Sequence, residues 1–346
     1  MPSTGPHIPA PGITAASATA SSSTAPPPAI TATGLAKSYG DKQVLDGIDL
    51  HIAEGSVFAL LGPNGAGKTT TVQILSTLIP ADSGEARVAG HDLTREADAV
   101  RAAIGVTGQF SAVDNLLTAE ENLILMADLH HLERREGRRR AAGLLGRFDL
   151  TEAATKSVAT FSGGMRRKLD LAMTLVGDPR VIFLDEPTTG LDPRSRRTMW
   201  EIIRGLVADD GVTIFLTTQY LEEADQLADR IAVLDHGKLV AEGTAEELKR
   251  RIPGGHIRLH FTEDSGLEAA AALFGAGTRD GEALTLDIPS DGSLSTLRAV
   301  LDILEHGGVQ AEALTVHTPD LDDVFLTLTG RPQSGHGAGS QKEYAR

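Results

Sequence analysis

The sequence predicts an α/β fold with a parallel sheet, and two observations lead to this class. Apolar runs with the length of buried strands alternate with segments of helical periodicity between about residue 56 and residue 217. One of these runs, residues 56–61, passes directly into Gly62-Pro-Asn-Gly-Ala-Gly-Lys-Thr69 and then into a helical pattern. A strand, a glycine-rich turn and a helix in this order are typical of a phosphate-binding loop.

This loop makes nucleotide binding the first hypothesis. Glycines let successive backbone N–H groups face one anion, and the positive end of the following helix dipole adds to the attraction. We expect Lys68 to reach the β- and γ-phosphates, and the hydroxyl of Thr69 to be a ligand of Mg²⁺. A strand-to-helix turn without any ligand is the alternative. The residues expected to bind the nucleotide here are Gly62, Pro63, Asn64, Gly65, Ala66, Gly67, Lys68, Thr69 and Thr70.

The elements on either side of the loop follow from periodicity and turn signals. Residues 30–61 read as short strands joined by turns, which predicts an antiparallel β subdomain. A helix is expected over residues 68–78. The capping box Thr118-Ala-Glu-Glu121 then opens a mainly helical stretch, which predicts a helical insertion over about residues 110–165. Further expected elements are a helix from about 165, strands at 181–185 and 212–217, a helix at 193–208, and a hairpin at 231–241.

The domain organisation follows from composition. A second capping box, Thr244-Ala-Glu-Glu247, opens a helix that stops before Pro253-Gly-Gly255, and we place the domain boundary there. Alternating strand and helix patterns beyond it predict a small C-terminal α/β domain. The expected units are a disordered Ala/Pro/Ser/Thr-rich tail over 1–29, a nucleotide-binding domain over 30–252, the small domain over 255–330 and a polar tail over 331–346.

Composition excludes several classes of function. The 346 residues carry 32 Lys and Arg against 47 Asp and Glu, a formal charge of -15, which disfavours nucleic acid as a partner. The absence of cysteine excludes disulfides and thiolate metal sites. No run approaches the ~18 to 20 apolar residues needed to cross a bilayer, so we expect no direct membrane span. Any membrane role therefore requires a second polypeptide.

Two carboxylates follow a buried strand in Val181-Ile-Phe-Leu-Asp-Glu-Pro187. Open α/β sheets bind ligands at the carboxyl edge of their strands. Asp185 is suited to hold Mg²⁺ or its water, and Glu186 to orient or deprotonate the attacking water. The alternative interpretation is a solvated helix cap. The phosphate loop in the same chain favours the functional interpretation over this one.

The segment Phe161-Ser-Gly-Gly-Met165 resembles the signature Leu-Ser-Gly-Gly-Gln of the ATP-binding cassette (ABC) family, with departures at Phe161 and Met165. Taken alone, Ser162 is a plain N-cap. The resemblance implies instead that Ser162, Gly163 and Gly164 bind nucleotide. Three further positions match the family. The resemblance implies that Tyr39 stacks on adenine and that Asp192 lies at the interface between two cassettes. It implies that Gln109 touches Mg²⁺, acts in hydrolysis and communicates with a membrane partner.

One position departs from this family, because Gln219 follows Leu216-Thr-Thr218 where a switch histidine is usual. A glutamine amide donates a hydrogen bond but cannot carry the proton charge of histidine. We therefore expect Gln219 to keep the geometric role in catalysis, as a donor to the γ-phosphate, and to lose the electrostatic role.

Three segments, starting at Phe161, Thr217 and Thr318, are similar to the daunorubicin-resistance type of exporter ATP-binding subunit. The resemblance implies a P-loop NTPase with a mixed sheet, hydrolysis of ATP with Mg²⁺, and a head-to-tail homodimer that holds ATP between Lys68 of one copy and Ser162 and Gly164 of the other. It also implies a separate transmembrane permease subunit and a place at the cytoplasmic face of the cell membrane. The alternatives are an importer subunit, a soluble cassette ATPase that protects antibiotic targets, and a chromosome-maintenance ATPase. The last of these needs coiled coils or zinc cysteines that are absent from the sequence.

Overall fold

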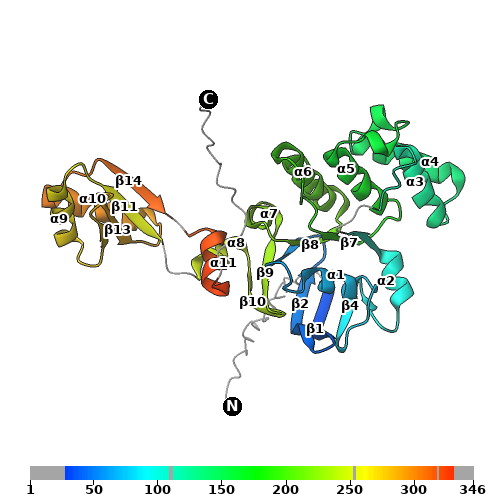
Figure 1. Cartoon of the computed structure of the whole chain (residues 1–346), viewed down its shortest axis with the longest axis horizontal. Helices are drawn as coiled ribbons and strands as arrows, with labels where there is room; N and C mark the ends of the chain where they lie inside the picture. The colour runs from blue at the N-terminus through cyan, green and yellow to red at the C-terminus, as the bar shows by residue number, and fades with distance from the viewer. Residues whose placement is uncertain (1–27, 109–111, 252–254, 318, 331–346) are drawn as a thin grey trace, which may run out of the picture.

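The computed structural model describes residues 28–108, 112–251, 255–317 and 319–330 (Figure 1). These residues form three sheets with helices packed against them. Two of the sheets and most of the helices make up the larger part of the molecule, and the third sheet forms a smaller unit at one end.

A six-stranded sheet lies at the centre of the larger part and confirms the predicted α/β class. Its strand order is β10-β9-β3-β8-β7-β6, and every neighbouring pair is parallel except β9 with β10. The carboxyl ends of the parallel strands therefore meet at one edge of the sheet. The strands are β3 (Val57–Leu61), β6 (Ile104–Thr107), β7 (Val181–Asp185), β8 (Thr213–Thr218), β9 (Arg230–Asp235) and β10 (Lys238–Gly243).

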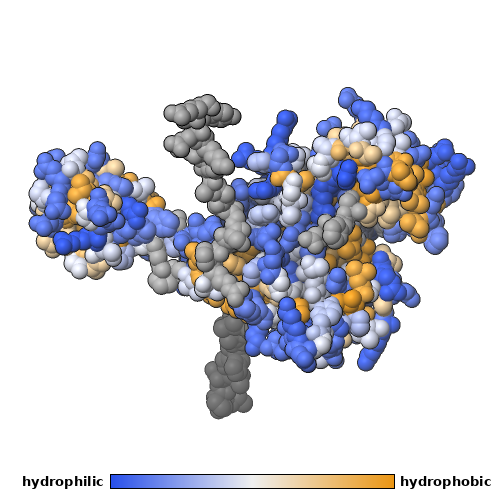
Figure 2. All heavy atoms as spheres, in the orientation of Figure 1, coloured by the Kyte–Doolittle hydropathy of each residue, from blue (hydrophilic) through white to orange (hydrophobic). Residues whose placement is uncertain are grey.

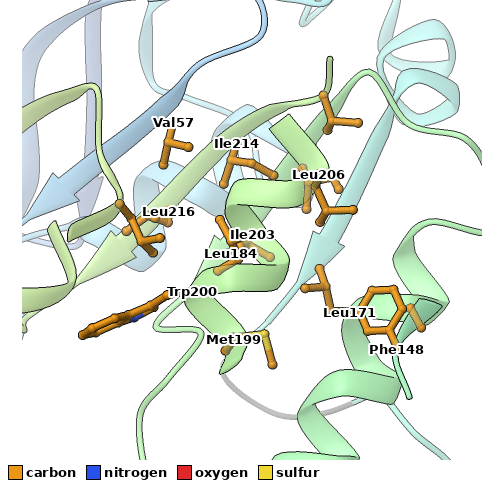
Figure 3. Close-up of a cluster of buried hydrophobic side chains, with 14 of the residues drawn as sticks. Val57, Phe148, Leu171, Leu184, Met199, Trp200, Ile203, Leu206, Ile214 and Leu216 are labelled. Atoms are coloured by element: carbon orange, nitrogen blue, oxygen red, sulfur yellow. The ribbon is translucent and has the colours of Figure 1, made fainter. Parts of the chain in front are cut away.

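The inner strands of this sheet are buried on both faces. Val57 and Leu61 of β3 belong to one hydrophobic cluster, whereas Phe58 belongs to another, because successive side chains of a strand point to opposite faces. Figure 3 shows the first cluster, in which side chains of β3, β7 and β8 meet helix α6 (Pro193–Asp210). Burial on both sides explains why these strands read as continuous apolar runs in the sequence.

Two helices of the larger part begin where their capping boxes predict. Thr118 and Glu121 form one capping box, and Thr244 and Glu247 form another. The helix after the phosphate loop ends at Leu75, three residues before the predicted end. The helices are α1 (Lys68–Leu75), α2 (Ala97–Ala103), α3 (Ala119–Leu129), α4 (Arg134–Arg147), α5 (Gly163–Thr174), α7 (Leu221–Leu227) and α8 (Ala245–Arg250), with 3-10 turns at Thr151–Ala153 and Val158–Thr160.

An antiparallel sheet of order β2-β1-β4-β5 packs beside the central sheet. Sequence reasoning did not foresee its last two strands, nor α2 and β6, which follow them. The segment β4 buries only Ala86 and Val88 of six residues, and such a polar pattern is not typical of a strand. The strands are β1 (Pro28–Tyr39), β2 (Lys42–Ala53), β4 (Ser83–Val88) and β5 (His91–Asp92).

The smaller unit is an antiparallel sheet of order β12-β13-β11-β14 packed on two helices. Ile257 and Leu259 of its central strand and Leu267 of its first helix lie in a separate hydrophobic cluster. The unit therefore has its own core. Its elements are β11 (His256–His260), α9 (Asp264–Leu273), β12 (Thr278–Asp280), β13 (Thr285–Pro289), α10 (Leu294–Gly307) and β14 (Ala313–His317).

The last helix, α11 (Leu321–Thr329), packs elsewhere. Leu321, Val324 and Phe325 lie in the first cluster of the larger part, and α11 contacts α7 and α8. The range 255–330 that the sequence suggested as one domain thus contains a helix that returns to the nucleotide-binding part, while residues 255–317 supply the separate core.

No helix among the described residues combines the length and the apolar character that crossing a membrane requires.

Candidate nucleotide-binding site

The glycine-rich loop lies between β3 and α1, and two of its glycines sit where no side chain fits. A Cβ at Gly62 would lie 2.3 Å from the carbonyl oxygen of Leu234, and one at Gly67 would lie 2.6 Å from Cδ2 of Leu45. Gly67 also has φ +117°, outside the range of ordinary residues. The loop backbone is therefore pressed against its neighbours in a shape that requires glycine.

Lys68, the first residue of α1, is folded back over this loop. Its ammonium donates to the carbonyl oxygens of Gly62 (2.9 Å) and Pro63 (3.2 Å), and it lies 3.6 Å from Oε1 of Glu186. The side chain is only 5% exposed. Burial lowers the pKa of the Lys68 ammonium, and the charges of Glu186 and Asp185 oppose part of this effect. The cation is thus held beside two carboxylates in a place with little water.

Asp185 ends β7 and is buried. Its Oδ1 accepts a hydrogen bond from the hydroxyl of Thr217, its partner on the neighbouring strand β8. Thr217 was not foreseen as a site residue, although a polar Thr-Thr pair at the end of an apolar strand is a usable signal. The hydroxyl fixes one carboxylate oxygen and leaves the other available to a ligand.

Glu186 has a strained backbone. Its φ is +50°, a left-handed value that costs a non-glycine residue about 1 to 3 kcal/mol. Its N–H donates to the carbonyl oxygen of Thr217 at 3.1 Å, and its Oε2 accepts from the hydroxyl of Thr189 at 3.2 Å. The turn directs the carboxylate toward Lys68 instead of continuing the strand, which is the type of strain expected at functional sites.

The donors available to a metal ion fit Mg²⁺. Thr69 is exposed in the first turn of α1, and Asp185 supplies a carboxylate oxygen. Magnesium prefers oxygen ligands and normally keeps several waters and phosphate oxygens, so two protein donors are sufficient. Within the described ranges no group of three or more His, Asp or Glu side chains could hold a metal ion by itself. Gln109, the third expected ligand, lies outside the described residues.

Gln219 follows β8 at the same edge of the sheet. Thr218, the residue before it, pairs with Leu61 of β3, and its carbonyl oxygen accepts from the N–H of Gly62 at 3.3 Å. The side chain of Gln219 is half-buried. Strand pairing therefore brings Gln219 next to the start of the phosphate loop, although 157 positions separate Gln219 from Gly62 in the sequence (219 - 62 = 157).

The residues of the signature segment stand at the start of α5. Ser162 is the N-cap of α5 and accepts from the N–H of Met165 at 3.2 Å. Helix α5 packs with α3, α4 and α6, on the side of the helical insertion (Figure 1). Gly163 is exposed beside Ser162, and a Cβ at Gly164 would lie 2.7 Å from Oγ of Ser195 in α6.

Asp192 caps α6 close to the signature segment. Its carboxylate accepts from the N–H groups of Arg194 and Ser195, each at 3.0 Å, and from the Ser195 hydroxyl at 2.6 Å. The bond from the Ser195 hydroxyl is the largest cause that lowers the pKa of Asp192. Within one copy, Asp192 is thus a helix cap that binds Ser195, the side chain that lies against Gly164.

Tyr39 lies at the end of β1 in the antiparallel sheet. Half of it is exposed, and the ammonium of Lys37 lies 5.7 Å from the ring centroid. The ring is open to stacking by a planar ligand.

Residues 45–189 match the ABC transporter family. The chain is 51% identical over 304 residues to a daunorubicin resistance ATP-binding protein of Streptomyces coeruleorubidus, which covers 87% of this chain and 96% of that protein. It is 46% identical to a daunorubicin/doxorubicin resistance ATP-binding protein of Streptomyces peucetius, over 89% of this chain and 94% of that protein.

A third relative, a Nod factor export ATP-binding protein of Ralstonia nicotianae, is 36% identical over 88% of this chain and 94% of its own length. Among solved structures, an ATP-binding subunit of an ABC transporter superimposes with a TM-score of 0.58 at 29% identity, over 64% of this chain and 92% of that chain. A dimeric, post-hydrolysis ATP-binding cassette bound to ADP and phosphate superimposes with a TM-score of 0.57 at 26% identity, over 62% and 98%.

Proposed function

Because the chain belongs to the ABC transporter family of ATP-binding proteins, we propose that it binds and hydrolyses ATP to power an exporter whose membrane-spanning part is a separate subunit. The observation that carries the proposal is the meeting of Lys68, Asp185 and Glu186 beside the glycine loop. A buried cation facing two carboxylates at the carboxyl edge of a parallel sheet suits the transfer of a phosphoryl group to water.

Each residue of this cluster receives a role. Lys68 binds the β- and γ-phosphates, and Thr69 with Asp185 holds Mg²⁺, which compensates phosphate charge when bound. Glu186 orients the attacking water or accepts its proton. Lys68 lies 3.6 Å from Glu186 in the present structure. Phosphates that attract the ammonium weaken this ion pair and leave the carboxylate free to face the water.

The remaining nucleotide contacts follow from position. Tyr39 stacks on the base, as its exposed ring allows. Gln219 donates from its amide to the γ-phosphate, because strand pairing places it beside Gly62. Gln109 also contacts the metal in this proposal, which rests for this residue on the family resemblance alone.

A second copy of the chain completes the site. In one copy the helix that follows Ser162, α5, packs with α3, α4 and α6, whereas Lys68 begins α1 on another part of the molecule. A head-to-tail dimer would bring Ser162 of one copy to the phosphates held by the other, with Asp192 at the interface. One similar solved structure is itself described as dimeric and bound to ADP and phosphate.

The transported compound is proposed to be a hydrophobic drug-like molecule, because two of the relatives confer daunorubicin resistance and a third is an export protein. The membrane subunit would contact the helical insertion. Leu116, Leu125 and Leu129 of this insertion are large and exposed, and hydrophobic residues gather over this part of the surface (Figure 2). Binding to such a subunit would place the chain at the cytoplasmic face of the cell membrane.

Nucleotide binding by the purified full-length chain tests the proposal. We expect radiolabelled ATP with Mg²⁺ to be retained by the unaltered chain. Lys68→Ala should weaken retention by about 10-fold or more, since it removes a charge-assisted contact worth about 1.5 to 3 kcal/mol. Lys249→Ala, which removes a half-buried lysine paired with Asp225 away from the loop, is the matched control and should bind as the unaltered chain does. Failure of the unaltered chain to retain ATP would refute the proposal.

A further inference from the structure

We infer that Arg167, held by Asp170, is a positioning residue that sets the backbone of the catalytic carboxylates from the signature helix. The inference rests on the proposed function and deepens it. Both residues belong to α5, which begins directly after Ser162, and neither is part of the expected nucleotide-binding set.

The guanidinium of Arg167 binds three consecutive carbonyl groups at the end of β7. Nε donates to the carbonyl oxygen of Pro187 at 2.9 Å, and Nη2 donates to those of Asp185 at 3.2 Å and Glu186 at 3.4 Å. These are the carbonyls of the turn in which Glu186 adopts its left-handed φ. The strained turn is thus fixed from the carbonyl side by Arg167 and from the N–H side by Thr217.

The same pair also binds the chain beyond β6. Nη1 of Arg167 donates to the carbonyl oxygen of Gly108 at 3.0 Å, and Oδ1 of Asp170 accepts from the N–H of Ala112 at 3.0 Å. Gly108 and Ala112 are the described residues on either side of the three that the structure leaves undescribed. One ion pair therefore joins the signature helix to two segments at the carboxyl edge of the sheet.

The chemistry of the pair requires an arginine. The guanidinium offers five N–H donors in a planar fork, and here its three nitrogens contact four backbone carbonyls and the Asp170 carboxylate, the latter at 3.1 Å. The side chains of Arg167 and Asp170 are 12% and 3% exposed. A lysine at this position could serve at most three of these acceptors, and a glutamine fewer and without charge.

A mechanical consequence follows for the dimer. The N-terminus of α5 carries the signature residues that the proposed second copy presents to its partner's nucleotide. A shift of α5 moves the guanidinium, and the guanidinium moves the peptide groups of Asp185 and Glu186 in the same copy. Engagement of the signature by the partner's nucleotide thereby adjusts the glutamate that acts on this copy's own water.

The test compares Arg167→Gln with Arg140→Gln in the full-length chain. Arg140 is also a partly buried arginine that donates to a carbonyl oxygen, that of Val176 at 2.7 Å, and pairs with Glu136. Arg140 belongs to α4, and the carbonyl that it binds follows the end of α5 opposite to Ser162. Because Arg167→Gln leaves Asp170 buried without its cation, the double variant Arg167→Gln with Asp170→Asn removes both charges and guards against simple misfolding.

We expect Arg167→Gln and the double variant to lower kcat for ATP by about 10- to 100-fold, the size of effect that follows a displacement of about 1 Å in a catalytic group. The Kd for ATP should change by less than about 2-fold, because the phosphate loop is untouched. Arg167→Lys should recover part of kcat, and Arg140→Gln should leave both constants unchanged. Hydrogen exchange in the peptide covering residues 185–189 should rise in the Arg167 variants alone.

Unchanged kcat together with unchanged exchange in this peptide would overturn the inference. A parallel loss of ATP binding, kcat and thermal stability in Arg167→Gln and in the double variant would also overturn it, since this would mark a merely structural residue. An unaltered chain that fails to bind ATP would overturn the proposed function instead, and the exchange measurement would still decide whether Arg167 holds the turn.

Discussion

Strand β7, an inner strand of the six-stranded sheet, and β11, an inner strand of the small sheet, have the same length and opposite surroundings. All five residues of β7, Val-Ile-Phe-Leu-Asp, are buried, including the carboxylate of Asp185. In β11, His-Ile-Arg-Leu-His, only Ile257 and Leu259 are buried, and Arg258 is exposed. The first strand must satisfy its polar end with specific partners, whereas water serves the second. Burial therefore makes the polar end of β7 depend on specific hydrogen-bond partners, whereas the exposed face of β11 tolerates substitution.

Two ion pairs show the same contrast. Arg167 and Asp170 lie at 3.1 Å with almost no exposure, while Arg258 and Asp287 lie at 2.7 Å with 45% and 27% of their side chains exposed. The exposed pair is the shorter one. Distance alone thus does not rank the two pairs, and the difference in solvation predicts which of them the protein depends on.

The largest expected effect comes from the carboxyl end of β7, where the proposed catalytic glutamate lies. Glu186→Gln should lower ATP hydrolysis by about 10²- to 10⁴-fold, the usual contribution of a positioned general base, and should leave ATP binding intact. Because hydrolysis no longer removes the nucleotide, the variant should form a dimer with ATP and Mg²⁺. Phosphate release and size-exclusion chromatography with and without ATP measure the two effects. Rapid turnover by Glu186→Gln would show that another group activates the water.

A smaller effect is expected when one partner is removed from each ion pair. Asp170→Asn should lower the free energy of unfolding by up to about 3 to 5 kcal/mol, because Arg167 stays buried and loses the carboxylate it pairs with. Asp287→Asn should change it little, since water reaches both groups. Urea unfolding of the two variants beside the unaltered chain makes the comparison. Equal destabilisation by both substitutions would remove the distinction between the two regions.

The smallest effect is a difference in pH dependence between two carboxylates. Glu223 is fully buried in the larger part and accepts from the Thr188 hydroxyl and the Trp200 indole, and burial raises its pKa. The hydrogen bond from Arg258 lowers the pKa of Asp287 in the small unit. The two groups should therefore change stability in opposite directions with pH.

The sign for Glu223 follows from proton uptake. With its pKa raised, the folded state binds more protons than the unfolded state at pH values above the ordinary 4.5, so stability falls as pH rises from there. Glu223→Gln should remove this fall. Asp287 instead contributes stability above its ordinary value of 3.8 that is lost as pH falls further, and Asp287→Asn should remove that loss. Unfolding free energies of both variants and of the unaltered chain, measured from about pH 3 to about pH 8, give the pH dependence that each carboxylate contributes. Contributions of the same sign from Glu223 and Asp287 would contradict the contrast.

Much of the larger part could be predicted because its signals are local. The bend of the phosphate loop requires glycine at Gly67, and both capping boxes form between residues three positions apart. The buried strands β3, β7 and β8 appear as short apolar runs. The polar strand β4 and the two-residue β5 were missed, because their place in the sheet depends on pairing with β1 and not on their own composition.

The residues that support the site could not be found in the same way. Thr217 contacts Asp185 across 32 positions of sequence, and Arg167 contacts Gly108 across 59. The Thr-Thr pair at the end of an apolar strand is a local signal for Thr217, but it does not name Asp185 as the partner, and nothing near Arg167 marks it, since an arginine in a helix is ordinary. The roles assigned to Ser162, Asp192 and Tyr39 stay predictions, because their expected partners are a nucleotide and a second copy of the chain.

The sequence alone determined where the glycine-rich loop bends, where several helices begin, which strands are buried and which family the chain resembles, because glycine, capping side chains and apolar spacing act on near neighbours. The tertiary structure alone decided that α11 returns to the larger part, that Glu186 turns back toward Lys68, and that one guanidinium joins the signature helix to the catalytic turn. These outcomes depend on strand order, which brings remote segments to one sheet edge and leaves buried polar groups to find partners there.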